Sequence, residues 1–356
     1  MSNKPLELSL SKTAAYSFDF LVFIGRFQPF HNGHFHVLQT ALTQAEHVIV
    51  LVGSSYQARD SRNPWTFAER EAQILSALSA EQGERLIILP LLDDLYNDQN
   101  WVSRVQQSVH GVTCRFPPKI GRQTPRIGLI GYSKDESSYY LSLFPQWESM
   151  NVAAQDNLSS TPIREQFFLH DQISTDLPDA VQHYLDNFRQ TTTHQNIVKE
   201  WQFIHDYLSG WENTPYPPIF VTVDAVVIQA GHVLLVERKA RPGEGLLALP
   251  GGFIRPQEKL KDAVIRELRE ETRIKIPAPV LMGSIIREQV FDAPHRSARG
   301  RTITHAYLIE LKPDRAGLAK VKGNDDARQA LWVPLGELNP AVLFEDHFHI
   351  IKAMVG

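Results

Sequence analysis

Cysteine is almost absent from this chain of 356 residues, which contains only Cys114. A single cysteine cannot form an internal disulfide, so a disulfide-stabilised secreted fold is excluded and a cytoplasmic protein is expected. The segment before Phe18 lacks the apolar centre of a signal peptide. No apolar run approaches the ~20 residues that span a bilayer, so no membrane association is expected.

An excess of basic residues is also missing. Residues 1–190 hold 15 Lys and Arg against 20 Asp and Glu, and residues 191–356 hold 21 against 20. Binding along a nucleic-acid backbone requires a basic surface, so nucleic acid is not expected as the main partner. The length is too great for one small core and favours two domains. Whether the chain forms a homo-oligomer stays open.

Apolar runs alternate with amphipathic segments in the first half of the chain. The runs typical of buried strands are residues 18–25, 47–54, 85–92, 126–132 and 149–155. The segments with a helical pattern between them are 33–45, 67–80 and 100–110. This alternation predicts an α/β fold: a doubly wound, Rossmann-like parallel sheet with helices on both faces and ligands beyond the carboxyl ends of its strands.

The pattern changes after residue 178, where the chain becomes helical. The stretch WENTPYPPIF (211–220) then interrupts it with three prolines, which mark a domain boundary. From residue 219 two strand-like runs flank a turn at Ala230 and Gly231, as in a hairpin. We therefore expect a first domain at 1–190, a helical linker at 191–214 and a second domain of α+β type at 215–356.

The stretch GRFQPFHNGH (25–34) follows the first expected strand and opens the first helix. Gly25 and Gly33 permit close approach of the backbone, and a helix N-terminus offers unpaired N–H groups to an anion. His31 and His34 can donate to phosphate oxygens, and Arg26 adds a fixed charge. These residues predict a site that binds the phosphates of a nucleotide.

The stretch SSTPIR (159–164) predicts a second phosphate-binding segment. Thr161 is expected as the N-cap of a helix and Pro162 as its first residue, so that Arg164 projects from the helix start. The alternative is a capped helix with a solvated arginine.

These two stretches resemble the HxGH signature and the second phosphate-binding motif of nucleotidyltransferases. Together with NPWTFAER (63–70) and Trp101, they resemble the archaeal-type nicotinamide mononucleotide adenylyltransferases. The resemblance implies that His31, His34 and Arg164 act in catalysis by holding the phosphates of ATP, and that Trp101 stacks on the nicotinamide ring. It also assigns binding of ATP or nicotinamide mononucleotide to Gly25, Arg26, Phe27, Gly33, Arg70, Ser160 and Thr161.

Other interpretations of this half stay open. Trp101 can be a core aromatic residue of an amphipathic helix. Class I aminoacyl-tRNA synthetases share the histidine motif, although no basic anticodon-binding domain follows it here. Another adenylyl- or cytidylyltransferase, acting on pantetheine phosphate or glycerol phosphate, is a further alternative.

Three glutamates crowd one helix face in the stretch RELREETRI (266–274). Glu267, Glu270 and Glu271 stand at i, i+3 and i+4, where like charges oppose the helix. A divalent cation relieves this repulsion, and Mg²⁺ is usually held by a few carboxylates together with substrate phosphates. Arg266 can pair with one carboxylate and orient it. A cation held there would activate water against a pyrophosphate bond, whereas the alternative is a solvated charged helix.

The longer stretch LPGGFIRPQEKLKDAVIRELREETRI resembles the Nudix box at every defined position except Arg273, where the family has glycine. The resemblance implies that Glu267, Glu270, Glu271 and the Gly251 carbonyl bind Mg²⁺ or Mn²⁺, with Glu267 and Glu271 acting in catalysis. The family's glycine ends a helix and contributes no chemical group. We therefore expect Arg273 to leave the hydrolase active.

Residues 290–311 resemble the branch of the Nudix family that handles ADP-ribose. Arg296, Arg299 and Arg301 are expected to bind ADP-ribose, unless they form a solvated basic loop. Both halves together resemble bifunctional nicotinamide mononucleotide adenylyltransferase/Nudix hydrolases. This implies that ATP and nicotinamide mononucleotide give NAD and pyrophosphate, and that ADP-ribose gives AMP and ribose 5-phosphate. The alternative is another nucleotidyltransferase whose Nudix domain is a non-catalytic ADP-ribose sensor.

Overall fold

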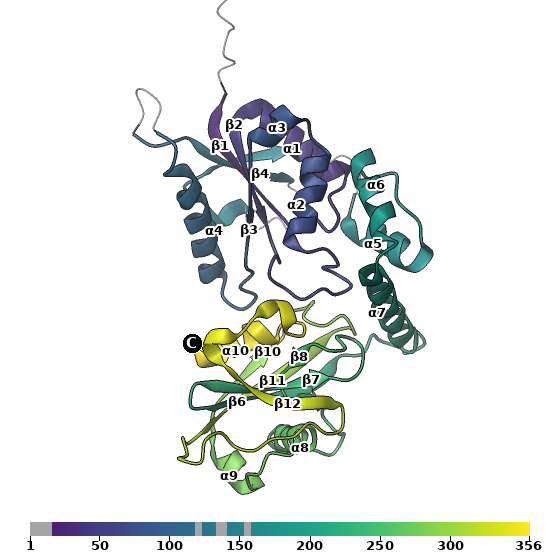
Figure 1. Ribbon diagram of the computed structural model, residues 1–356, viewed down its shortest axis with the longest axis vertical. Coiled ribbons are helices and arrows are strands. Elements are labelled where there is room, and N and C mark those ends of the chain that lie inside the picture. Colours follow the sequence, from purple (N-terminus) through teal and green to yellow (C-terminus); the bar gives the residue numbers. More distant parts are fainter. Residues whose placement is uncertain (1–15, 118–122, 133–140, 153–157) are drawn as a thin grey trace, which may run out of the picture.

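The computed structural model of the protein describes residues 16–117, 123–132, 141–152 and 158–356 (Figure 1). Two bodies, each built around one sheet, are stacked along the long axis of the molecule. Within the described residues no helix is long and apolar enough to cross a membrane.

Five parallel strands form the N-terminal sheet in the order β3-β2-β1-β4-β5, which confirms the predicted doubly wound class. The strands are β1 Phe18–Gly25, β2 Ala45–Val52, β3 Leu86–Pro90, β4 Ile127–Tyr132 and β5 Glu148–Val152. The end of the fifth expected strand, residues 153–155, lies outside the described residues. The helices of this half are α1 Asn32–Gln44, α2 Phe67–Ser76, α3 Ala80–Glu84, α4 Asp98–Thr113, α5 Ser160–His170, α6 Asp179–Phe188 and α7 Thr192–Ser209.

The apolar sequence of β1 explains why both faces of this sheet are covered. Phe20 and Val22 point to one face and belong to a buried cluster with residues of α4 such as Val105. Leu21 and Phe23 point to the other face and belong to a cluster with α1, α5, α6 and α7. A strand buried on both sides reads as a continuous apolar run, which is what the sequence has.

The C-terminal sheet is mixed, with the order β10-β11-β6-β7-β12, and β8 and β9 pair with β7 and β6. Its strands are β6 Phe220–Gln229, β7 His232–Arg238, β8 Leu247–Ala248, β9 Gly251–Phe253, β10 Ile285–Phe291, β11 Thr302–Leu311 and β12 Ala327–Pro334. The predicted hairpin turn is confirmed. Ala230 and Gly231 have φ angles of 46° and 74°, as a two-residue turn between twisted strands requires.

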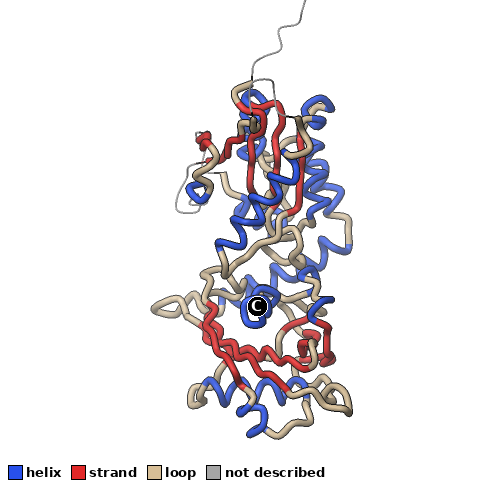
Figure 2. The backbone as a smooth tube through the Cα atoms, turned by 90° about the vertical axis from the view of Figure 1, so that its left-hand side faces the viewer, coloured by secondary structure: helices blue, strands red, loops and turns tan. Residues whose placement is uncertain are grey.

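Helices cover both faces of the C-terminal sheet. Helix α8 (Leu260–Thr272) packs on one face together with the short α9 (Ala278–Gly283). Helix α10 (His347–Val355) packs on the other face against β7 and β11. Figures 1 and 2 show α10 between the two sheets, so the final helix lies at the junction of the two halves.

Helix α7 was expected to be a linker, but it packs on the N-terminal core. Ile197 is buried, and Trp201 stacks on Phe168 of α5 with ring centroids 6.2 Å apart. The proline-containing segment then leads directly into β6. We therefore propose that the N-terminal domain extends to Ser209 rather than ending at residue 190.

A fragment of residues 1–210 should be more stable than a fragment of residues 1–190. Removing α7 exposes apolar side chains such as Phe168 and takes away Ile197. Because burial of one such side chain contributes about 1.5–3 kcal/mol, the loss should be at least about 3 kcal/mol. Urea unfolding of the two fragments measures the difference. Equal free energies of unfolding would show that α7 is a linker and not part of the N-terminal domain.

Candidate active sites in the two halves

The two histidines of the first motif cap helix α1 reciprocally. Nδ1 of His31 accepts from the backbone N–H of His34 at 3.4 Å, and Nδ1 of His34 accepts from the N–H of His31 at 3.3 Å. Their rings stack with centroids 3.7 Å apart. When Nδ1 of a neutral imidazole accepts, Nε2 carries the proton. The structure thus brings two donors to a helix N-terminus, where an anion is favoured.

The glycines of this motif make room for aromatic rings. A Cβ on Gly25 would lie 2.8 Å from the ring of Phe27, and one on Gly33 would lie 3.0 Å from the ring of His31. The side chain of Phe27 is buried, with 1% of its surface exposed. The side chain of Phe27 therefore supports the histidines from the interior, and binding of ATP or nicotinamide mononucleotide at Phe27 stays a prediction.

Helix α5 carries Arg164, and its capping residue differs from the prediction. Ser159 is the N-cap and accepts from the N–H of Thr161 at 3.5 Å, so the predicted cap at Thr161 is wrong. Thr161 instead accepts from Nη2 of Arg164 at 3.2 Å. Ser160 is the first residue of the helix. All three hydroxyl residues can cap, so the sequence alone does not choose among them.

Arg164 is buried beside two further arginines. Its Nη1 donates to the carbonyl of Gln28 at 2.7 Å. Burial is the main cause that lowers its pKa to about 10, and the nearby charges of Arg26 and Arg62 lower it further. Arg62 was missed in the sequence because it lies outside both phosphate motifs. Arg26 directly after β1, Arg62 in the loop before α2 and Arg164 on α5 thus form a cationic site that a polyphosphate would stabilise.

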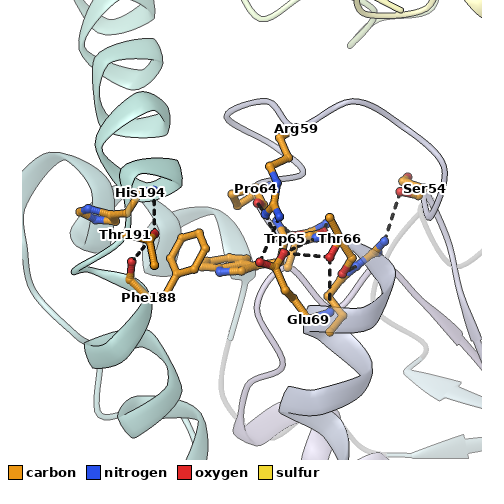
Figure 3. A network of polar contacts seen from close by, with 11 residues as sticks. Ser54, Arg59, Pro64, Trp65, Thr66, Glu69, Phe188, Thr191 and His194 are labelled. Carbon is orange, nitrogen blue, oxygen red and sulfur yellow. Dashed lines mark hydrogen bonds and ion pairs between the residues drawn. The ribbon is translucent and has the colours of Figure 1, made fainter. Parts of the chain in front are cut away.

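The NPWTFAER stretch is anchored by its own hydrogen bonds (Figure 3). Thr66 and Glu69 form a capping box at the start of α2. Arg59 donates to both carboxylate oxygens of Glu69, at 2.6 and 3.0 Å, and to the carbonyl of Pro64 at 2.7 Å. The loop between β2 and α2, which carries Arg62, is thereby fixed beside the helix.

Arg70 has a supporting role, which corrects its predicted place as a ligand-binding residue. Its side chain is fully buried, with 0% exposure. The guanidinium donates to the backbone carbonyls of Arg26 and Gly53, both at 2.7 Å, and to that of Ser54 at 3.2 Å. Arg70 therefore joins the ends of β1 and β2 and has no surface to offer a ligand.

Trp101 lies on α4 and is partly buried, with its ring centroid 5.9 Å from that of Phe144. Its packing against the core agrees with the alternative of a core aromatic residue as much as with a stacking platform. Its binding of nicotinamide therefore stays a prediction.

In the C-terminal half, Arg266 neutralises part of the carboxylate face of α8. Its Nη1 donates to Glu267 at 2.7 Å and to Glu270 at 3.0 Å, and its Nε and Nη2 donate to Glu258 at 2.7 and 2.8 Å. The predicted pairing of Arg266 with a carboxylate is confirmed. Glu258, which lies in the loop before the helix, is tied to the helix by the same contact.

Glu271 lies deeper than the other glutamates. Its Oε2 accepts from the N–H of Gly251 at 3.0 Å, and only 9% of the residue is exposed. Burial raises the pKa of its carboxyl to about 8, and the nearby charge of Glu267 raises it further. Burial also raises the pKa of Asp224 and that of Glu267.

These groups line one pocket of about 420 Å³, which also contains three residues from the end of the chain. Its lining includes Asp224, Arg238, Gly251, Glu267, Glu270, Glu271, Arg296, Arg299, Phe344, Glu345 and His347. His347, on helix α10, accepts from the N–H of Leu249 at 2.8 Å and also contributes to the pocket wall.

The lining of this pocket suits a divalent cation. Several carboxylates are buried together, and a positive ion would relieve the cost that raises their pKa values. The described residues contain no ready-made group of three His, Cys, Asp or Glu side chains that could hold a metal. A cation such as Mg²⁺ does not require one, because one or two carboxylates and the substrate phosphates suffice.

The three predicted ADP-ribose arginines have different surroundings. Arg296 is 3% exposed and forms a two-bond ion pair with Asp346, at 2.9 and 2.8 Å. Arg299 lies over the ring of Phe253 at 5.3 Å. Arg301 donates to the carbonyl of Asp292 and does not line the pocket. The structure thus brings Arg296 and Arg299 to the pocket and leaves Arg301 outside it.

Comparison with known proteins agrees with this division. Residues 22–166 match the cytidylyltransferase-like family and residues 218–354 the NUDIX domain. The chain is 37% identical over 188 residues to the nicotinamide/nicotinic acid mononucleotide adenylyltransferase of Acinetobacter baylyi, which covers 52% of this chain and 95% of that protein. It is 34% identical over 132 residues to the ADP-ribose pyrophosphatase of Methanocaldococcus jannaschii, covering 37% of this chain and 70% of that protein.

A solved structure of another protein matches both halves together. It is a bifunctional NMN adenylyltransferase/ADP ribose pyrophosphatase from Francisella tularensis, complexed with AMP and a manganese ion. The two chains are 35% identical with a TM-score of 0.87, and the match covers 95% of this chain and 98% of the other. This chain belongs to the bifunctional NMN adenylyltransferase/Nudix hydrolase family. Nudix hydrolases require a divalent metal, in agreement with the acidic pocket.

The Nudix box of this family member departs from the pattern at Arg273, and the structure shows how. Arg273 ends α8 in the left-handed conformation, with a φ angle of 44°. Its side chain donates to Asn324, whose own N–H groups bind the carbonyls of Glu270 and Glu271 at 3.0 and 2.9 Å. Arginine thus adopts the backbone conformation that glycine favours, and it adds a contact at the helix end.

Arg273→Gly should change stability slightly and hydrolase turnover by less than about threefold. Glycine relieves a backbone strain of about 1 kcal/mol, but the contact with Asn324 is lost. The glutamates that line the pocket are untouched. Thermal unfolding and kcat for ADP-ribose check both statements. The contrary result is a wild-type protein without hydrolase activity that Arg273→Gly activates. It would show that arginine at this position suppresses hydrolysis.

Proposed function

We propose that the N-terminal half joins nicotinamide mononucleotide to ATP, giving NAD and pyrophosphate, and that the C-terminal half hydrolyses ADP-ribose to AMP and ribose 5-phosphate. The observation that carries this proposal is the presence of two sites of opposite charge on one chain. One site gathers arginines and histidines near helix N-termini, and the other is lined by buried carboxylates. The Francisella relative, which carries both names, supports the same pairing. We also propose that the protein is cytoplasmic.

The adenylyl transfer needs no nucleophile from the protein. A phosphate oxygen of nicotinamide mononucleotide forms a bond to the α-phosphorus of ATP while the bond from that phosphorus to the leaving pyrophosphate breaks. His31, His34 and Arg164 stabilise the charge that grows on the phosphate oxygens. Arg26 and Arg62 add to the positive field. The N-termini of α1 and α5 orient the triphosphate, so the protein contributes positioning and charge.

The hydrolysis uses the acidic pocket. Water adds to one phosphorus of the pyrophosphate bridge, the bond to the bridging oxygen breaks, and AMP and ribose 5-phosphate leave. Glu267, Glu270, Glu271 and the Gly251 carbonyl would hold the cation, which we propose to be Mg²⁺. When bound, it supplies charge neutralisation at the bridge and activation of the attacking water. Arg266 keeps Glu267 and Glu270 oriented, and Arg299 adds a cation to the lining of the same pocket.

His34→Ala should reduce kcat for NAD formation by about 10²-fold or more, because a donor to the developing charge is lost. Hydrolysis of ADP-ribose should not change. His36→Ala, on the same helix but outside the capping box, is the matched control and should keep both activities. The measurement is chromatographic separation of NAD. Undiminished NAD formation by the His34 variant would show that the histidine motif takes no part in the reaction.

Glu271→Gln should abolish ADP-ribose cleavage, with a loss of about 10²-fold or more, while NAD formation continues. Removal of divalent metal with EDTA should have the same effect on hydrolysis, and added Mg²⁺ should restore the wild-type protein only. Glu310→Gln, an exposed position on β11, is the control. If the wild-type protein binds ADP-ribose but releases no AMP, the domain is a sensor and not a hydrolase.

A further inference from the structure

Two loops of the C-terminal half form walls of the acidic pocket. The loop between β7 and β8 (residues 239–246) contributes Ala240 and Arg241. The loop between β10 and β11 (residues 292–301) contributes Arg296 and Arg299. Both loops are contacted by side chains that the N-terminal half provides.

Glu200 of α7 holds the first loop. Its Oε1 accepts from the N–H of Gly243 at 2.6 Å, and its Oε2 accepts from Nη1 of Arg241 at 3.3 Å. The side chain of Glu200 is only 13% exposed. Charge-assisted hydrogen bonds are stronger where water is excluded, so this carboxylate is a firm anchor for the loop. Figure 1 shows that α7 descends from the N-terminal body to the level of the C-terminal sheet.

Gly243 connects the contact with Glu200 to the pocket wall. Its φ angle is 77°, and a Cβ at this position would lie 2.3 Å from the ring of Phe344. The tip of the loop therefore rests directly on Phe344, which lines the pocket and lies under the guanidinium of Arg238 at 4.0 Å. By holding the Gly243 N–H, Glu200 keeps the loop seated on this ring.

The second loop is held in a similar way. The hydroxyl of Tyr96, between β3 and α4, donates to Asp346, which is the partner of Arg296 in the buried ion pair. The ring of Tyr96 packs edge-on against Phe291 with centroids 4.8 Å apart. Arg62 donates to the backbone carbonyls of His295 and, at 3.2 Å, of Ser297, on either side of Arg296.

We infer that Glu200 and Tyr96 are positioning residues of the hydrolase, supplied by the N-terminal half. They hold the two pocket loops in the conformation that binds ADP-ribose. This inference rests on the proposed ADP-ribose hydrolysis. Neither residue lines the pocket or contacts the glutamates of α8, so both act on substrate binding and not on bond cleavage.

The test compares variants of the full-length protein. Glu200→Ala should raise KM for ADP-ribose about tenfold and keep kcat within threefold. Glu200→Gln retains an acceptor for the Gly243 N–H and should recover part of the loss. Gln202→Ala is the matched control, because Gln202 is exposed on the same helix and its side-chain amide donates to Asp206, also on α7, at 2.8 Å. Tyr96→Phe keeps the ring and removes only the hydroxyl, and it should raise KM about threefold.

NAD formation and thermal unfolding of the Glu200 variants separate positioning from general damage. An increase in KM with both of these unchanged supports the inference. Unchanged KM in Glu200→Ala and Tyr96→Phe would overturn it, as would a fall in kcat without a change in KM. Parallel loss of both activities and of thermal stability would show that Glu200 only stabilises the fold. A wild-type protein without ADP-ribose hydrolysis would instead overturn the proposed function, and the inference would fall with it.

Discussion

The ion pairs of Arg266 allow α8 to carry three glutamates on one face. Carboxylates at i, i+3 and i+4 repel one another and oppose helix formation. Arg266 compensates by donating to Glu267 and Glu270 on its own helix and to Glu258 in the loop that leads into it. It does not contact Glu271, whose hydrogen bond goes to the Gly251 backbone. The Glu271 carboxylate lines the pocket, where we propose that a cation and a pyrophosphate complete the charge balance.

The N-terminal site follows the same principle with the opposite sign. Arg164 is buried and is held by the Gln28 carbonyl, while Arg26 and Arg62 add like charges that lower its pKa. A buried cation is costly unless it has a counter-charge. Among the described residues no carboxylate forms an ion pair with Arg164, although the nearby charge of Asp60 raises its pKa. In the proposed function a polyphosphate supplies the counter-charge. In the proposed function the substrate therefore completes the charge balance of both sites, and the same groups stabilise the charge that develops in the transition state.

Sequence reasoning succeeded where spacing along the chain decides the geometry. The carboxylate face of α8, the two-residue hairpin at Ala230 and the alternation of strands and helices all depend on residues fewer than about ten positions apart. It failed where distant residues meet. Arg62 reaches the anion site through the fold, and the partner of Arg296 is Asp346, 50 positions later. Arg70 looked like a ligand-binding cation because burial cannot be read from a motif.

Helix α7 couples the two halves of the chain despite the proline-rich break between them, because it packs on the N-terminal core and also contacts a loop of the C-terminal pocket. Successive residues of a helix are rotated by about 100°, so neighbouring side chains point in different directions. Trp201 packs on Phe168 of the N-terminal core, while Glu200, one position earlier, binds the loop that rests on Phe344. Because these residues share a rigid helical backbone, the core of one half sets the position of a pocket loop in the other. The proline-rich segment connects the two halves covalently. The noncovalent contact that positions the pocket loop comes from α7, which precedes that segment in the chain.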